Sequence, residues 1–272
     1  MSQRIRAVFD HLRAQGRKAL IPFIMGGDPD GSTTAPLLLA LEDAGADLIE
    51  VGIPFSDPLA DGPTIQRAAA RALDRGATPA KVLSAIASVR HRIRVPIVCL
   101  SYWNPIVQFG DAHGAALTPE PFLRAARASG VSGVIVPDLP VEEGALLQRA
   151  AARCHLATIY LAAPTSPPER LRNIVRASDG FIYYVSVTGT TGARRALPST
   201  LVQGIRHVKL LTTKPVCVGF GISTPTQARA VAQIADGVII GSALIDAMAH
   251  AKGRAARRRR ACAFLAAFRR VV

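Results

Sequence analysis

The chain has 272 residues, 49% of them hydrophobic, and a formal net charge of +14. This length fits one large domain, and no apolar run approaches the ~20 residues that a membrane-spanning helix needs. The four cysteines form no CxxC pair and the six histidines form no HExxH pattern, so a metal site built by the protein is not expected. The charged, amphipathic N-terminus lacks the apolar segment of a secretory signal, and we expect a cytoplasmic protein.

The excess positive charge is concentrated near the C-terminus. From Lys252 onward there are eight basic residues and no acidic ones. Leu265 and Phe268 have helical spacing, so we expect a basic C-terminal helix at about residues 252–272 that packs on the body. Arg257 to Arg260 are then solvated charges at its start. Contact with an anionic surface or RNA is the alternative, but no recognition-helix or zinc-finger pattern accompanies the arginines, and we do not expect nucleic-acid binding.

In chain order, an amphipathic N-terminal stretch precedes eight short apolar runs rich in β-branched residues. Segments rich in Ala, Leu and Arg, with a period of about 3.6 residues, separate the runs and predict helices; residues 64–76 and 142–154 are examples. The apolar runs predict strands, and they begin at Ala19, Asp47, Val95, Gly133, Leu156, Phe181, Lys214 and Asp236.

This alternation of strands and helices predicts right-handed βαβ units and a parallel sheet. The strands are almost continuously apolar, as expected when both faces of a sheet are buried. Eight such units favour a closed (β/α)8 TIM barrel with an extra N-terminal helix, formed as a single domain over residues 1–272. An open doubly wound sheet is the alternative, but residues 25–30 after the first strand lack its GxGxxG nucleotide fingerprint.

In such a barrel, catalytic residues lie at the C-terminal ends of the strands. Glu50 interrupts the second apolar run, and Asp47, Asp57 and Asp61 belong to the same strand or its loop. Two carboxyl groups near one cleft can act as acid and base if their environments separate their pKa values. We expect a raised pKa for the more buried Glu50 and an ionised Asp61. The alternative is a structural carboxylate paired with an arginine.

Three further strand ends carry small, polar or aromatic residues. Residues 186–195 are rich in Gly, Thr and Ser, which is typical of a mobile loop that closes over a ligand. Small residues in 219–223 and 241–244 would let backbone N–H groups approach a phosphate, which barrels often bind after strands 7 and 8. Aromatic side chains near the strand ends indicate a flat apolar pocket: Phe23, Tyr102, Trp103, Tyr183 and Phe220.

These features together resemble the tryptophan synthase alpha chain family. The run LIEVGIPFSDPLADGPTIQ, residues 48–66, is similar to the family's signature almost throughout. Residues 133–143, 186–194 and 219–223 are also similar to family segments and follow in the family's order. The resemblance extends from the start of the chain to about Asp246. Two segments depart from the family pattern: residues 109–121 are longer than the family's third loop, and the arginine-rich tail is not a family feature.

The resemblance implies a role for each matching residue. Glu50 would be the general acid and base, Asp61 would bind the indole N–H, and Tyr183 would lie near the cleavage site. Thr191 would meet the second-loop aspartate when the loop closes. The indole pocket and the phosphate cradle would be formed by Phe23, Leu100 and Phe220 and by Gly192, Gly221, Gly241 and Ser242, respectively.

The resemblance also implies a reaction and a partner. Members of the family cleave indole-3-glycerol phosphate to indole and glyceraldehyde 3-phosphate, and work in an α2β2 complex with a tryptophan synthase beta subunit. Asp57 and Pro58 match positions at that interface. The chain itself would bind no cofactor, since pyridoxal phosphate belongs to the beta subunit. The alternatives are a stand-alone indole-releasing lyase of secondary metabolism, another phosphate-binding barrel, and a catalytically silent regulatory or RNA-associated protein.

Overall fold

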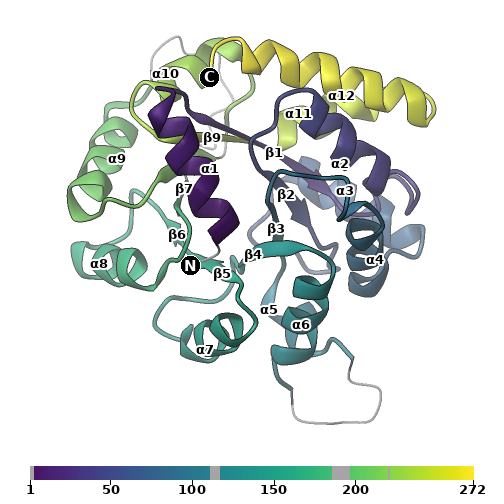
Figure 1. Ribbon diagram of the computed structural model, residues 1–272, viewed down its shortest axis with the longest axis horizontal. Coiled ribbons are helices and arrows are strands. Elements are labelled where there is room, and N and C mark those ends of the chain that lie inside the picture. The colour runs from purple at the N-terminus through teal and green to yellow at the C-terminus, as the bar shows by residue number, and fades with distance from the viewer. Residues whose placement is uncertain (1–2, 111–116, 186–196, 220) are drawn as a thin grey trace.

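The computed structural model describes residues 3–110, 117–185, 197–219 and 221–272. Within these residues the strands form one parallel sheet with the order β5-β4-β3-β2-β1-β9-β8-β7-β6. Figure 1 shows the strands arranged as a ring with the helices outside. The strands are β1 (Ala19–Met25), β2 (Ile49–Gly52), β3 (Ile97–Leu100), β4 (Val131–Ile135), β5 (Ala157–Ile159), β6 (Leu161–Ala162), β7 (Ile182–Val185), β8 (Val216–Gly219) and β9 (Gly237–Ile240).

The barrel closes at Tyr160, the residue that separates the two end strands of the sheet. β5 pairs with β4 and β6 pairs with β7, so the fifth predicted strand is divided into two short strands. The Tyr160 N–H donates to the Ser178 Oγ at 3.3 Å, while its carbonyl accepts from Tyr183 N at 3.2 Å. The predicted TIM barrel is confirmed, and the open doubly wound alternative is wrong.

A helix follows each strand except β5, and the helices form the outer layer (Figure 1). Several begin with proline in the first turn, where its missing N–H costs nothing. The helices are α1 (Gln3–Ala14), α2 (Thr34–Asp43), α3 (Pro63–Asp74), α4 (Pro79–Val89), α5 (Trp103–Val107), α6 (Glu120–Ala128), α7 (Ala145–Arg153), α8 (Pro168–Ala177), α9 (Ser199–Leu211), α10 (Pro225–Ala232), α11 (Ser242–Ala249) and α12 (Arg254–Arg269).

The predicted N-terminal helix, α1, covers the end of the barrel at which the strands begin. In Figure 1 it lies across the middle of the ring of strands. Phe9 packs on Phe181 with ring centroids 5.8 Å apart, and Arg4 donates to the Arg94 carbonyl at 2.8 Å. Since Arg94 and Phe181 precede β3 and β7, α1 covers the end of the barrel at which the strands begin.

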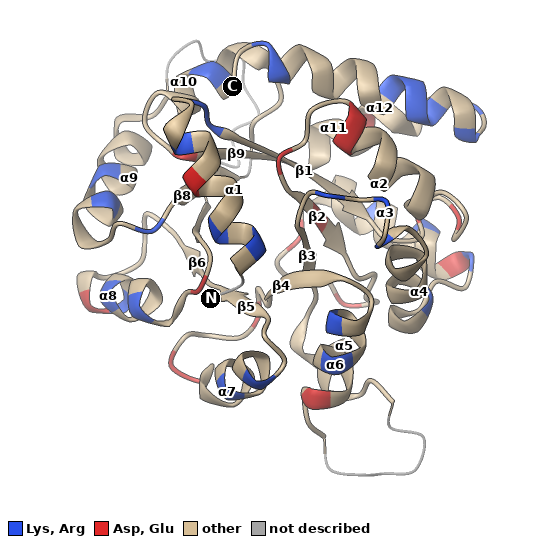
Figure 2. Cartoon of the chain, viewed as in Figure 1, with Lys and Arg blue, Asp and Glu red and all other residues tan. Residues whose placement is uncertain are grey.

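The basic helix α12 packs along the outside of the barrel. Leu265 and Phe268 are buried against the body, whereas Arg258, Arg259 and Arg260 are exposed. Figure 2 shows α12 at the edge of the molecule with basic segments towards both ends. The charges at the start of α12 are therefore solvated while its apolar side is buried, as the spacing of its apolar residues predicts.

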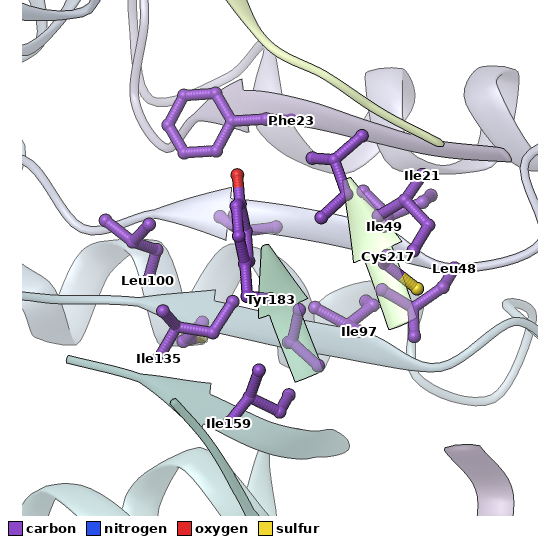
Figure 3. Packing of buried hydrophobic residues seen from close by; sticks show 14 of the residues in the cluster. Ile21, Phe23, Leu48, Ile49, Ile97, Leu100, Ile135, Ile159, Tyr183 and Cys217 are labelled. Atoms are coloured by element: carbon purple, nitrogen blue, oxygen red, sulfur yellow. The ribbon is translucent and has the colours of Figure 1, made fainter. Parts of the chain in front are cut away.

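The interior of the barrel is filled by side chains from the strands. Every residue of β1, β2, β3 and β4 is buried, in agreement with their continuous apolar sequence. Figure 3 shows Ile21, Ile97 and Cys217 in the packed layer, with Tyr183, Phe23 and Leu100 to one side of it. The core is thus solid near the α1 end, and open space remains near the C-terminal ends of the strands.

Candidate active site

A pocket opens at the C-terminal ends of the strands, and it gathers residues from seven separate segments of the chain. The space is about 590 Å³ including the part open to solvent, a size typical of small-molecule sites. Its lining consists of Phe23, Glu50, Asp61, Gly62, Ile65, Leu100, Tyr183, Gly221, Ile222, Ile239, Gly241 and Ser242.

Glu50 lies in the middle of β2, level with Phe23 of β1 and Val98 of β3. Its side chain is 1% exposed, and among the described residues neither carboxyl oxygen has a hydrogen-bond partner. Burial, together with the charge of Asp61, raises the pKa of Glu50 to about 8. A buried carboxyl group left without a partner is costly and favours its neutral form. The alternative of a structural carboxylate paired with an arginine does not hold for the described part of the chain.

Asp61 reaches the pocket from the loop between β2 and α3. Its backbone N–H donates to the Pro58 carbonyl at 3.1 Å, and its carbonyl accepts from Gln66 Nε2 at 2.9 Å. Burial raises the pKa of Asp61 to about 6, and a hydrogen bond from the Tyr102 hydroxyl limits this rise. The same hydroxyl accepts the Ala60 N–H at 2.9 Å. Tyr102 therefore holds both the loop and the carboxylate.

The two carboxyl groups differ in protonation near neutral pH. At pH 7, Glu50 with a pKa of about 8 is mostly protonated, and Asp61 with a pKa of about 6 is mostly ionised. This separation supplies one acid and one base in the same cleft. The sequence-based prediction of a raised pKa for Glu50 is confirmed, whereas the raised pKa of Asp61 was not predicted.

Apolar side chains form the walls beside these carboxyl groups. Phe23, Leu100 and Tyr183 line the pocket as predicted, and Figure 3 shows the Tyr183 hydroxyl directed towards Phe23. Two glycines leave room for the rings: a Cβ at Gly52 would lie 2.7 Å from the Phe23 ring, and one at Gly219 would lie 2.5 Å from the Tyr183 hydroxyl. The result is a narrow apolar slot suited to a planar group.

The other end of the pocket is formed by the start of α11. Gly241 precedes this helix and offers no side-chain cap, so the first backbone N–H groups are available to an anion. By contrast, α10 begins with a complete capping box between Thr224 and Gln227. Of the helices that follow β8 and β9, only α11 has an open N-terminus at the pocket, where Ser242 adds a hydroxyl group.

The structure shows the position of most of the predicted site residues, and one acidic residue of the second predicted strand lies far from the pocket. Asp47 lies before β2 at the α1 end of the barrel, where it accepts from Leu20 N at 2.8 Å and pairs with Arg269, so it is not near the pocket. Asp57 is exposed on the loop after β2, and Pro58 beside it is half-buried. Thr191, Gly192 and Phe220, together with the predicted closing loop 186–195, lie outside the described residues.

Sequence analysis missed several lining residues. Ile65, Ile222 and Ile239 line the pocket but are ordinary apolar residues in the sequence. Tyr102 was predicted only as a wall of the pocket, whereas the structure places its hydroxyl on the Asp61 loop. Among these residues, Ile239 could have been predicted from the sequence. It lies two residues before Gly241, and residues two positions apart in a strand face the same side.

A parallel barrel with a pocket at the C-terminal ends of its strands has the architecture and the site position of the (β/α)8-barrel enzymes. A family model described as tryptophan synthase alpha chain matches residues 9–270. The chain is therefore a member of the tryptophan synthase alpha chain family, whose members are enzymes of tryptophan biosynthesis.

Individual relatives agree with this assignment. The chain is 52% identical over 249 residues to the tryptophan synthase alpha chain of Gloeobacter violaceus, covering 91% of this chain and 87% of that protein. It is 50% identical to the one from Carboxydothermus hydrogenoformans, covering 89% and 88%. The solved tryptophan synthase subunit alpha of Legionella pneumophila superposes with a TM-score of 0.88 at 36% identity, covering 98% of this chain and 97% of that one. A chain of Mycobacterium tuberculosis tryptophan synthase gives 0.88 at 38% identity, covering 99% and 98%.

Proposed function

We propose that this chain is the alpha subunit that cleaves indole-3-glycerol phosphate to indole and D-glyceraldehyde 3-phosphate. The observation that carries the proposal is the pair of carboxyl groups, Glu50 and Asp61, with separated pKa values at one end of an apolar slot. The open N-terminus of α11 at the other end suits the phosphate of the same substrate.

The proposed chemistry is a retro-aldol cleavage. Protonated Glu50 donates its proton to indole C3, and the resulting positive charge on the ring nitrogen is stabilised by ionised Asp61. Glu50 then takes the proton of the hydroxyl group on the adjacent side-chain carbon. The carbon–carbon bond breaks, its electron pair restores the aromatic ring, and the side chain leaves as an aldehyde. Glu50 ends protonated as it began, so one group with a pKa near neutrality serves as acid and base.

The remaining residues would bind the substrate. Phe23, Leu100 and Tyr183 would enclose the indole ring, and Gly221, Gly241 and Ser242 would hold the phosphate. Thr191, Gly192 and Phe220, which lie outside the described residues, complete the set that the family resemblance implies.

We further propose that the chain passes indole to a tryptophan synthase beta subunit in an α2β2 complex. The loop after β2 that carries Asp57 and Pro58 also carries Leu59, whose side chain is 92% exposed. A single exposed leucine is common on protein surfaces, so the support for this partner comes from the family to which the chain belongs. Pyridoxal phosphate would be used by the beta subunit alone, and the chemistry of this chain would come from its own carboxyl groups.

The test is indole release from indole-3-glycerol phosphate by the purified chain, measured with and without a tryptophan synthase beta subunit. We expect weak activity of the chain alone and a large gain with the beta subunit. Strong activity without the beta subunit would instead indicate a stand-alone lyase. Absence of indole in both conditions would contradict the proposed substrate.

A further inference from the structure

Outside the pocket, a side-chain hydrogen bond joins the start of α3 to the middle of α11. The Thr64 hydroxyl lies 3.2 Å from both carboxylate oxygens of Asp246, a residue 182 positions later in the chain. Arg67, one turn along α3, donates to the Thr64 oxygen at 3.1 Å. Arg67, Thr64 and Asp246 therefore form a small hydrogen-bond network. Because the Thr64 oxygen accepts from Arg67, its own hydrogen is directed at Asp246.

The two helices that this contact joins carry opposite ends of the pocket. Asp61 and Gly62 immediately precede α3, and Thr64 is the second residue of that helix. Gly241 and Ser242 lie at the start of α11, one helical turn before Asp246. The distance between the Asp61 carboxylate and the open N-terminus of α11 thus depends on how α3 and α11 are held together.

A second contact extends the same network to β1, which carries Phe23. Arg71 of α3 donates through Nε and one terminal nitrogen to the two carboxylate oxygens of Asp28, each at 2.8 Å. Asp28 follows β1 by three residues. The hydrogen bond to Asp28 is the main cause of the raised pKa of Arg71, and the charge of Asp246 also contributes. The charge of Asp246 is therefore also felt at Arg71, two turns along α3 from Thr64.

We propose that Asp246 and Thr64 are positioning residues that set the separation between the carboxyl end and the phosphate end of the pocket. This inference depends on the proposed function, since it concerns a ligand that spans both ends. A ligand with two joined parts binds more tightly than its separate parts only if both subsites are held at the matching distance. Loss of the hydrogen bond between α3 and α11 should weaken binding of the joined ligand, while each subsite by itself stays intact.

The experiment compares three probes by calorimetry: indole, inorganic phosphate, and an indole that carries a phosphorylated three-carbon chain without the cleavable hydroxyl. In Asp246→Ala, we expect the affinity for the joined compound to fall about three- to tenfold, which is within the range for the net contribution of one typical hydrogen bond. The affinities for indole and for phosphate should not change. Thr64→Val should behave in the same way.

Two variants serve as controls. Asp246→Asn retains an oxygen that accepts from Thr64 and should restore tight binding of the joined compound. Asp74→Ala removes an exposed carboxylate from the other end of α3, without a hydrogen bond among the described residues, and should have no effect. This variant controls for the loss of one negative charge.

The outcomes separate the two proposals. If the unaltered chain binds the joined compound tightly and Asp246→Ala binds it equally well, the positioning role is wrong. Equal weakening of all three probes in Asp246→Ala also contradicts the positioning role, because it indicates general loss of structure. If the unaltered chain binds neither indole nor the joined compound, the proposed function itself is wrong.

Discussion

The charge of Asp61 raises the pKa of Glu50, although Glu50 lies within a buried strand and Asp61 on the loop that follows it. Both line the same pocket, and burial is the larger cause of the raised pKa for each. The negative charge of ionised Asp61 therefore disfavours ionisation of Glu50. The first three predictions concern these two carboxyl groups.

Glu50→Gln should abolish indole release while leaving the fold intact. Glutamine has nearly the same shape but cannot donate or accept the transferred proton, so we expect a loss of at least about 10²- to 10⁴-fold in kcat. The measurement is indole formation together with circular dichroism. Glu143→Gln, an exposed position after β4, is the matched control and should keep full activity. Near-normal turnover by folded Glu50→Gln would remove Glu50 from the mechanism.

Glu50 should also make the free energy of unfolding depend on pH. Its pKa rises from 4.5 to about 8 on folding, so its protonated form is favoured in the folded state. The stabilisation is complete below pH 4.5 and is lost as the pH rises through about 8, because the unfolded chain releases the proton first. The measurement is unfolding in urea at a series of pH values between these limits. As the pH rises, the free energy of unfolding of the unaltered chain should fall relative to that of Glu50→Gln, by at most ~1.4 kcal/mol per pH unit. A constant difference between pH 5 and 8 would contradict the assigned pKa.

The pH dependence of kcat/KM should be bell-shaped. Activity needs ionised Asp61 and protonated Glu50, so it should rise with an apparent pKa of about 6 and fall with one of about 8. Asp61→Asn removes the negative charge next to Glu50. Any residual activity of this variant should lose the acidic limb, and its alkaline limb should move to lower pH. An alkaline limb at the same pH as before would show that the two groups do not interact.

Tyr102→Phe should move the acidic limb to higher pH. The lost hydroxyl group lowers the pKa of Asp61 in the native chain, so its removal leaves the effect of burial unopposed. The control is Phe55→Leu, which alters the ring packed 5.4 Å from Tyr102 but keeps the hydroxyl. We expect the acidic limb of Phe55→Leu to stay in place. Equal shifts in both variants would assign the effect to packing instead of the hydrogen bond.

Gly52→Ala should narrow the apolar slot. The new Cβ would lie 2.7 Å from the Phe23 ring, so the ring has to move or the backbone has to shift. We expect a higher KM and a cost of about 1–3 kcal/mol in stability, as for other overpacked cores. Gly31→Ala is the control, because a Cβ there has no atom within 4 Å. Steady-state kinetics and thermal melts of both variants measure the effect.

Much of the architecture follows from local sequence. Eight apolar runs separated by helical segments predicted a barrel of parallel strands buried on both faces, and the amphipathic stretch before the first run predicted the N-terminal helix. Glu50 was identifiable because a carboxyl group in a buried strand is costly and therefore informative. The motif over residues 48–66 pointed to the family, and the family model and the relatives confirm it.

Other properties depend on contacts between distant parts of the chain. Asp47 and Glu50 are three residues apart, yet they lie towards opposite ends of the barrel: Asp47 pairs with Arg269 of α12, and Glu50 faces the pocket. The pKa values of Glu50 and Asp61, the hydrogen bond of Tyr102 and the link from Thr64 to Asp246 likewise arise only when strands and helices assemble. Periodicity determines which face of a strand or helix is buried, but the partner of a buried or polar group, and hence its charge, is determined by the tertiary packing around it.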